Sequence, residues 1–140
     1  MIILGIDPGR ARTGVAVCDP REIMASPVTV IHERSREALC EKIASVAAER
    51  MAELIVVGLP KNMDGTEGPA AAASRELAAM LEQRCALPVE LWDERGTTIT
   101  AQNLLNESDT RGSRRKAVID SVAAVIILEE YLAKRKNDKP

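Results

Sequence analysis

The chain has 140 residues, of which 46% are hydrophobic, which is enough for the core of one domain and short for two. Its 19 Lys and Arg nearly cancel its 21 Asp and Glu, so any nucleic-acid site would have to be a local basic patch. Trp92 and Tyr131 are the only aromatic residues. This scarcity disfavours modules that stack several bases on aromatic side chains.

The few cysteines and the single histidine argue against several kinds of metal and disulfide protein. Cys18, Cys40 and Cys85 are far apart and form no CxxC pair, and His32 has no second histidine to pair with. Disulfide scaffolds, zinc fingers and His-rich metal sites are therefore disfavoured, and free thiols fit a reducing cytoplasm. Because no segment resembles a signal peptide or a membrane span, we expect a cytoplasmic protein that does not associate with membranes.

The first third of the chain predicts three strands and a helix. Short β-rich runs cover residues 2–7, 13–18 and 26–31, and the turn beginning at Asp7 joins the first two as a hairpin. Apolar residues then recur at helical spacing over residues 35–50. Three strands in succession are not the start of a strict Rossmann alternation.

The rest of the chain alternates strands with helices. A continuous apolar run at residues 54–59 predicts a strand covered on both faces, and Pro69 suits the first turn of the helix that follows, to about residue 84. The remaining segments are a strand at 89–92, a helix at 98–106, a polar loop at 107–113, a helix at 114–136 and a frayed tail at 137–140. Together these elements predict one α/β domain over residues 1–140, with a mixed five-stranded central sheet flanked by helices.

Three acidic positions occur where a carboxylate is costly. Asp7 ends an apolar strand, Asp93 or Glu94 ends another, and Asp120 lies in an otherwise apolar helix. On a helical wheel Asp120 shares a face with buried-type residues, namely Ala123, Ala124, Ile127 and Tyr131. An unpaired carboxylate on such a face costs several kcal/mol, so it needs a cation or a set of hydrogen bonds.

A divalent cation accounts for the three acids together. Oxygen ligands without His or Cys suit Mg²⁺ or Mn²⁺, and titratable groups of this kind cluster at functional sites. Taken one at a time, ordinary structural roles remain open: Asp7 as a turn cap, Glu94 as a solvated loop residue, and Asp120 paired with Arg12, Arg95 or Lys116. We favour the metal interpretation for the set.

Two glycine-containing loops have the composition of phosphate sites. The first carries Arg10 and Arg12 around a tight turn, although most turns of this kind are only hairpin connections. The second carries Lys61 and Asn62 ahead of a helix N-terminus. For the second loop, spacing alone favours a plain strand-to-helix connection capped by Thr66 or Glu67.

The densest basic cluster precedes the helix that contains Asp120. It consists of Arg111, Arg114, Arg115 and Lys116. Runs of charge are usually solvated surfaces, but here the run leads into the proposed metal-binding helix. It could therefore steer substrate phosphates toward the carboxylates despite the net charge of -2.

Four blocks in this order resemble the YqgF family, also called RuvX, of RNase H-like nucleases. They are DPGRARTGVA at 7–16, VGLPKNMDGTEG at 57–68, DERGTT at 93–98, and Lys116 with Asp120 and AAVIIL at 123–128. The resemblance covers nearly the whole chain. It implies an RNase H-like fold and a metal-dependent nuclease whose catalytic acids, and Mg²⁺ or Mn²⁺ ligands, are Asp7, Glu94 and Asp120, with Asp93 as a further candidate ligand.

The resemblance also sets expectations for the substrate. Members are associated with maturation of the 5′ end of 16S ribosomal RNA, and the fold is shared with Holliday-junction resolvases, so pre-rRNA, branched DNA and single-stranded DNA are all candidates. We expect one or two metal ions, and a monomer or a homodimer. The residues expected to hold substrate phosphates are Arg10, Arg12, Asn62, Arg95, Arg111, Arg114, Arg115 and Lys116.

Two other functions stay open at the level of sequence. The first hairpin also resembles the phosphate loop of actin-like ATPases and sugar kinases, which usually need two such domains around a cleft. A non-catalytic nucleic-acid or protein-binding module is the second alternative, and the presence of all three acids disfavours it.

Overall fold

The computed structural model describes residues 1–93 and the backbone of residues 112–138, with side chains described in the latter segment from 122 to 137. The first three strands, β1 (Ile3–Asp7), β2 (Arg12–Cys18) and β3 (Ala25–His32), form an antiparallel meander. On the other side of β1, β4 (Leu54–Leu59) and β5 (Val89–Asp93) add in parallel. The order β3-β2-β1-β4-β5 confirms the predicted mixed five-stranded sheet.

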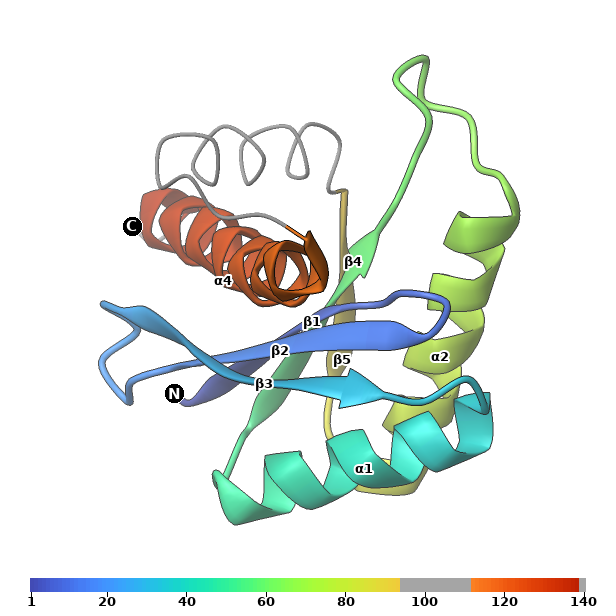
Figure 1. Cartoon of the computed structure of the whole chain (residues 1–140). Helices are drawn as coiled ribbons and strands as arrows, with labels where there is room; N and C mark the ends of the chain where they lie inside the picture. The colour runs from blue at the N-terminus through green and yellow to red at the C-terminus, as the bar shows by residue number, and fades with distance from the viewer. Residues whose placement is uncertain (94–111, 139–140) are drawn as a thin grey trace.

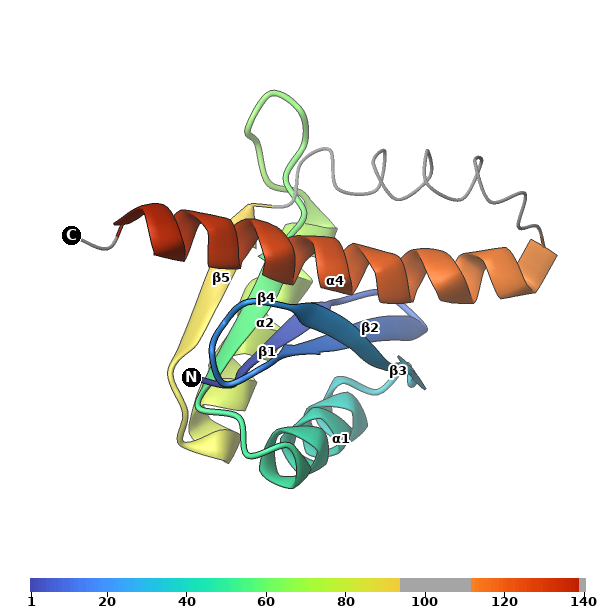
Figure 2. The ribbon, with the colours of Figure 1, turned by 90° about the vertical axis from the view of Figure 1, so that its left-hand side faces the viewer.

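Helices cover both faces of this sheet. The first two, α1 (Arg36–Glu49) and α2 (Pro69–Cys85), lie together on one face, and α4 (Gly112–Asp138) crosses the other, as Figures 1 and 2 show. This layering explains why every residue of β4 is buried, since the strand has no face open to solvent.

Strand alternation divides the core into two layers. On β1, Leu4 and Ile6 belong to the cluster beneath α1 and α2, whereas Ile3 belongs to the cluster beneath α4. On β5, Leu91 packs with the first cluster and Trp92 with the second. The parity of a strand residue therefore tells which helical layer its side chain meets.

A close approach of α4 to β1 sets the spacing of the second layer. A Cβ atom at Gly5 would lie 3.0 Å from Leu128 Cβ and 3.3 Å from the Ala124 carbonyl oxygen. Ala124, Ile127 and Leu128 are fully buried at this contact. The absence of a side chain at position 5 is thus what lets the helix rest directly on the strand.

Most element boundaries lie within one residue of those predicted. Ser35, at the predicted start of α1, is its N-cap, and its hydroxyl accepts a hydrogen bond from Ala38 N at 3.3 Å. The prediction that Thr66 or Glu67 caps α2 is wrong, because the cap position is Gly68 and no side chain caps this helix. The two candidate side chains are engaged elsewhere, Thr66 with Asp64 and Asn62, and Glu67 with Arg75.

The last helix is longer than predicted. It begins at Gly112, inside the predicted polar loop, and continues through Asp138, so the expected fraying from residue 137 is wrong for 137 and 138. The predicted helix at 98–106 lies outside the described residues. In the described part of the chain, no helix combines the length and the hydropathy that a membrane crossing requires.

Candidate functional site

One edge of the sheet gathers the carboxyl ends of its three parallel strands. Asp7 ends β1 and Asp93 ends β5, with β4 between them. The register places Ile6 beside Val57 and Leu59 beside Asp93, so both acids lie at nearly the same level. Ligand sites of open α/β sheets commonly form outside such strand ends.

The two acids nevertheless belong to opposite faces of the sheet. Ile6 packs toward α1 and α2, so Asp7, the next residue, has the parity of the α4 face. Trp92 packs toward α4, so Asp93 has the parity of the α1 and α2 face. A ligand held beneath α4 at this edge would therefore lie on the same face of the sheet as Asp7 and on the opposite face from Asp93.

The turn between β1 and β2 positions two of the predicted phosphate-binding arginines. A Cβ at Gly9 would lie 2.1 Å from the Arg12 carbonyl oxygen, so this tight turn requires glycine there. The Gly9 amide donates to Thr13 Oγ1 at 3.4 Å. Because Asp7 pairs with Gly14, Arg12 shares the face of Asp7. Arg10 is exposed within the turn.

The loop that follows β4 projects beyond the same edge (Figure 1). Asn62 lies in it, and its amide Nδ2 donates to Thr66 Oγ1 at 2.8 Å. The Asn62 carbonyl oxygen accepts a hydrogen bond from Gly65 N at 2.8 Å, with Gly65 at a φ of 90°. Asn62 therefore lies in a loop at the edge where the site is predicted. Its side-chain amide is hydrogen-bonded within that loop and helps to stabilise the conformation of the loop.

For the remaining predicted site residues, the structure gives at most the position of the backbone. Position 120 belongs to α4, one helical turn before the buried residue Ala124. Glu94, Arg95 and Arg111 lie outside the described residues, as do the side chains of Arg114, Arg115, Lys116 and Asp120. Among the side chains that are described, no three His, Cys, Asp or Glu groups form a metal-binding cluster.

The donors available at this edge suit a hard cation. Asp7 offers carboxylate oxygens at the end of a strand that is otherwise buried. The three thiols lie elsewhere: Cys18 ends β2, Cys40 lies within α1, and Cys85 ends α2. A carboxylate site without sulfur donors fits Mg²⁺ or Mn²⁺ better than zinc.

The C-terminal half of α4 packs against β5 through aromatic side chains and hydrogen bonds to glutamates. Trp92 and Tyr131 pack edge to face, with ring centroids 5.9 Å apart. Trp92 Nε1 donates to Glu130 at 3.1 Å, and the Tyr131 hydroxyl donates to Glu90. Burial, reinforced by the Glu90 carboxylate, raises the pKa of Tyr131 to about 12. These contacts fix the helix across the strand that ends in Asp93.

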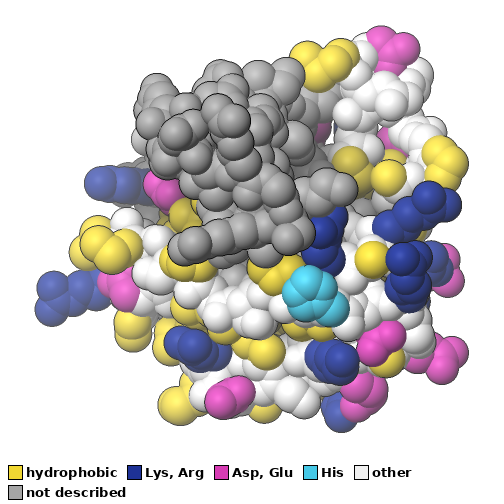
Figure 3. Space-filling model, in the orientation of Figure 1, with side chains coloured by type: hydrophobic (Ala, Val, Ile, Leu, Met, Phe, Trp, Pro, Cys, Tyr) yellow, Lys and Arg dark blue, Asp and Glu magenta, His cyan; other side chains and the backbone are white. Residues whose placement is uncertain are grey.

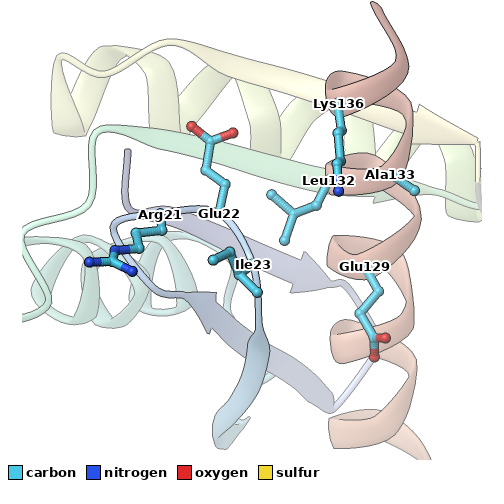
Figure 4. Close-up of a pocket in the computed structure, with 7 residues that line it drawn as sticks. All are labelled: Arg21, Glu22, Ile23, Glu129, Leu132, Ala133 and Lys136. Carbon is cyan, nitrogen blue, oxygen red and sulfur yellow. The ribbon is translucent and has the colours of Figure 1, made fainter. Parts of the chain in front are cut away.

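A hollow of about 420 Å³ lies between α4 and the β2–β3 turn (Figure 4). Leu132 points from the helix toward Ile23 of the turn, and Glu22 pairs with Arg135 at 2.6 Å. The turn follows the end of β2, which runs antiparallel to β1, so this hollow lies at the sheet edge away from Asp7. It is therefore separate from the acidic site.

Comparison with known proteins decides the family. The family model RuvX, described as "Holliday junction resolvase", matches residues 1–134. The chain belongs to the RuvX family. This confirms the resemblance identified from the four sequence blocks.

Relatives within the RuvX family match over nearly their full length. A protein of Clostridium botulinum (strain Eklund 17B / Type B) is 41% identical over 132 residues, covering 94% of this chain and 96% of the relative. One of Lachnospira eligens is 44% identical over 140 residues, covering 98% of this chain and all of the relative. Both carry the name "Putative pre-16S rRNA nuclease".

Solved structures confirm the RNase H-like fold of this RuvX chain. Thermus thermophilus RuvC in complex with a Holliday junction substrate aligns with a TM-score of 0.64 at 14% identity, covering 99% of this chain and 97% of RuvC. The fowlpox virus resolvase in its Holliday junction complex aligns with a TM-score of 0.58 at 10% identity, covering 96% and 99%. At these identities the likeness concerns the fold alone.

Proposed function

We propose that this RuvX protein is a cytoplasmic nuclease that hydrolyses phosphodiester bonds of nucleic acid, acting in maturation of the 5′ end of pre-16S rRNA. The observation that carries the proposal is the location of Asp7. Its carboxylate ends a buried strand, on the sheet face crossed by the helix that contains position 120. Family membership and the names of the relatives support a nuclease and an RNA substrate.

The metal ligands in this proposal are Asp7, Glu94 and Asp120. The parity of Asp93, opposite to that of Asp7, argues against Asp93 as the second ligand and so supports its neighbour in the sequence, Glu94. The buried residues Ala124, Leu128 and Tyr131 form a stripe whose helical spacing extends to position 120. We therefore infer that strand ends and helix converge on one or two Mg²⁺ or Mn²⁺ ions.

The protein's own groups have distinct roles in this scheme. A divalent cation, when bound, supplies positive charge to the phosphate and lowers the pKa of water. Asp7 contributes negative charge from the end of a strand whose other residues are buried. Arg12, on the same face, would hold a phosphate next to the scissile one. The other proposed phosphate contacts are Arg10, Asn62, Arg95, Arg111, Arg114, Arg115 and Lys116.

Replacement of Asp7 by Asn tests the proposal directly. We expect cleavage in Mg²⁺ or Mn²⁺ to fall by more than about a hundredfold, because even outer-shell partners of metal ligands cost 10- to 100-fold. The thermal midpoint should change little, since the substitution preserves size. Cleavage of a structured pre-16S RNA 5′ segment is the measurement, and cleavage retained by Asp7→Asn would overturn the scheme.

Matched substitutions on β5 separate the two neighbouring acids. Asp93→Asn should retain cleavage, because Asp93 has the parity of the opposite face, whereas Glu94→Gln should lose it. The reverse pattern would assign Asp93 as the ligand instead.

A junction resolvase is the second candidate function, supported by the family description and by the fold of RuvC. Four-way DNA junctions and single-stranded DNA, tested beside the RNA, separate the two. Symmetric junction cutting with no RNA cleavage would favour the resolvase, for which light scattering should give the mass of a dimer. Binding without cleavage of any substrate would favour a non-catalytic module.

A further inference from the structure

A second hollow, of about 230 Å³, opens where the β1–β2 turn meets α1 and α2. Its basic lining comes from three separate stretches of the fold: Arg10 from the turn, Arg34 from the β3–α1 connection, and Arg36 from the first turn of α1. Its floor includes Ser74 and Leu77 of α2. Figure 3 shows Lys and Arg side chains gathered on this side of the molecule, on the right of the view.

Two of these arginines have no ion-pair partner among the described residues. Arg36 pairs with Glu76, and Glu33, the one acid among the described lining residues, pairs with Lys42 at 3.2 Å. The side chains of Arg10 and Arg34 have no ion pair or hydrogen bond within the described part of the chain. Both therefore offer free guanidinium donors to the same cavity, and an anion is the chemistry that matches them.

The floor of the cavity offers a hydroxyl that also has no partner among the described residues. Ser74 is 1% exposed, and the described residues provide no hydrogen-bond partner for its side chain. A buried hydroxyl without a partner carries a desolvation cost that a ligand oxygen would offset. The N-terminal half of α2, which contributes Ala70 and Ala73 to the lining, has no side-chain cap at Gly68, and the positive end of a helix dipole favours an anion.

We propose that this cavity binds a phosphate group of the substrate strand, with Arg10 and Arg34 as forked donors and Ser74 donating from the floor. The inference rests on the proposed function for the source of the phosphate. That source is either an internal phosphodiester or the phosphate at the end of a strand. Arg34 and Ser74 were not identified from the sequence, because the cavity joins residues far apart in the chain.

The cavity and Asp7 lie on different sides of the same turn. Pro8, which follows Asp7 directly, lines the cavity, so the two sites are separated by little more than the turn itself. The cavity is bounded by α1 and α2, whereas Asp7 has the parity of the α4 face. A strand that reaches both sites therefore passes over the β1–β2 turn.

Binding of a short single-stranded RNA in EDTA, followed by fluorescence anisotropy, tests the cavity without metal or cleavage. We expect Arg10→Gln combined with Arg34→Gln to weaken binding about tenfold at low salt. Loss of one phosphate contact on a single strand should also reduce the slope of log K against log salt by about 0.7. Ser74→Ala should weaken binding without changing that slope, because it removes no charge.

Arg21→Gln is the matched control. Arg21 is exposed, and it lines the hollow at the opposite sheet edge. We expect the affinity and salt slope of this variant to equal those of the parent protein. Parent-like binding by the double arginine variant, or an equal loss in Arg21→Gln, would overturn the proposal.

Two further arms identify the source of the phosphate. If the cavity takes a terminal phosphate, RNA with a 5′ phosphate should bind more tightly than RNA with a 5′ hydroxyl, and the double variant should abolish that difference. If it takes an internal diester, both RNAs should lose affinity equally in the variant. In EDTA, Asp7→Asn removes only a negative charge that repels phosphate, so it should bind RNA at least as tightly as the parent while losing cleavage in Mg²⁺ or Mn²⁺, and failure of the cavity and failure of the nuclease proposal are therefore distinguishable.

Discussion

At the scale of single residues, two glycines show how differently one residue type is used in this chain. Gly9 has no room for a side chain, since a Cβ there would lie 2.1 Å from a backbone oxygen of Arg12. Gly68 has no heavy atom within 4 Å of its added Cβ and has an extended backbone, with φ at -105°. The first glycine is required by the turn, and the second is not required by space.

Gly9→Ala should therefore destabilise the protein by about 1–3 kcal/mol, the usual range for overpacking. Gly68→Ala, as the control, should cost less than about 1 kcal/mol, which is the scale of an unfavourable N-cap residue. Urea unfolding measures both. Equal effects at the two positions would mean that the β1–β2 turn relaxes freely around the added methyl group.

Tyr131 gives a pH-dependent prediction. Its pKa is raised from 10 to about 12, first by burial and then by the Glu90 carboxylate. The neutral phenol is thus favoured by folding, so this stabilisation is complete below pH 10 and is lost as the pH rises through about 12. Tyr131 is the only tyrosine, so tyrosinate absorbance reports on it alone.

We expect the absorbance midpoint to lie near 12 in the folded protein and near 10 in denaturant. Glu90→Gln is the control. Its midpoint should move down but stay above 10, because burial is the larger cause. A folded midpoint at the ordinary value would show that the hydroxyl is solvated.

At the scale of elements, the contact between α4 and β1 connects the fold to the site. Gly5 lets the helix backbone approach the strand, and the same helix contains position 120 one turn before Ala124. The distance between the strand end at Asp7 and this helix is therefore set by a packing contact that involves neither acid.

Gly5→Ala should lower both stability and cleavage. The added Cβ would lie 3.0 Å from Leu128 Cβ and 3.3 Å from a backbone oxygen, so the helix must shift outward. We expect a loss of about 1–3 kcal/mol in unfolding free energy. Cleavage should fall under conditions where the variant is still fully folded, as checked by circular dichroism. Full activity in the folded variant would show that the spacing of α4 and β1 does not govern the site.

The sequence predicted most elements because local signals bound them. Pro60 follows the buried strand β4, and Ser35 supplies the N-cap of α1. The cap of α2 could not be predicted in this way, because Thr66 and Glu67 are engaged by Asp64 and Arg75, and those contacts depend on how the loop folds.

The candidate site was predictable only in part. Asp7 was identifiable as a costly carboxylate at a strand end, but the opposite parity of Asp93 needs the packing of Trp92 and Leu91 to be known. The cavity with Arg34 and Ser74 needs the tertiary arrangement of a turn and two helices. The roles of Glu94 and Asp120 stay predictions, since their side chains lie outside the described residues.

At the scale of the whole molecule, the sheet separates two layers that each have a distinct role. The layer of α1 and α2 bounds the proposed phosphate cavity, and the α4 layer covers the face of Asp7. The net charge of the whole chain is only -2, so the arginines of the cavity form a local basic site and not part of a large basic surface. Substrate affinity should accordingly depend on these local sites more than on a long-range attractive field.

Metal binding should be visible in the stability of the whole protein. A ligand that binds only the folded state stabilises it by about 2.7 kcal/mol at 100 times its Kd. Mn²⁺ should therefore raise the thermal midpoint of the parent protein, and EDTA should reverse the rise. Asp7→Asn should show no such shift, whereas Asp93→Asn should behave as the parent does. A shift of equal size in Asp7→Asn would place the ion elsewhere.

The contacts of Trp92 with Tyr131 and Glu130 also make its intrinsic fluorescence a probe of the packing between α4 and β5. Trp92 is the only tryptophan, and Lys134 lies 5.5 Å from its ring centroid. All tryptophan fluorescence therefore originates where the last helix crosses the edge strand, one residue before Asp93. Lifting of that helix alone would change the emission while the circular dichroism of the sheet persists. Local opening beside the acidic edge can thus be followed without an introduced label.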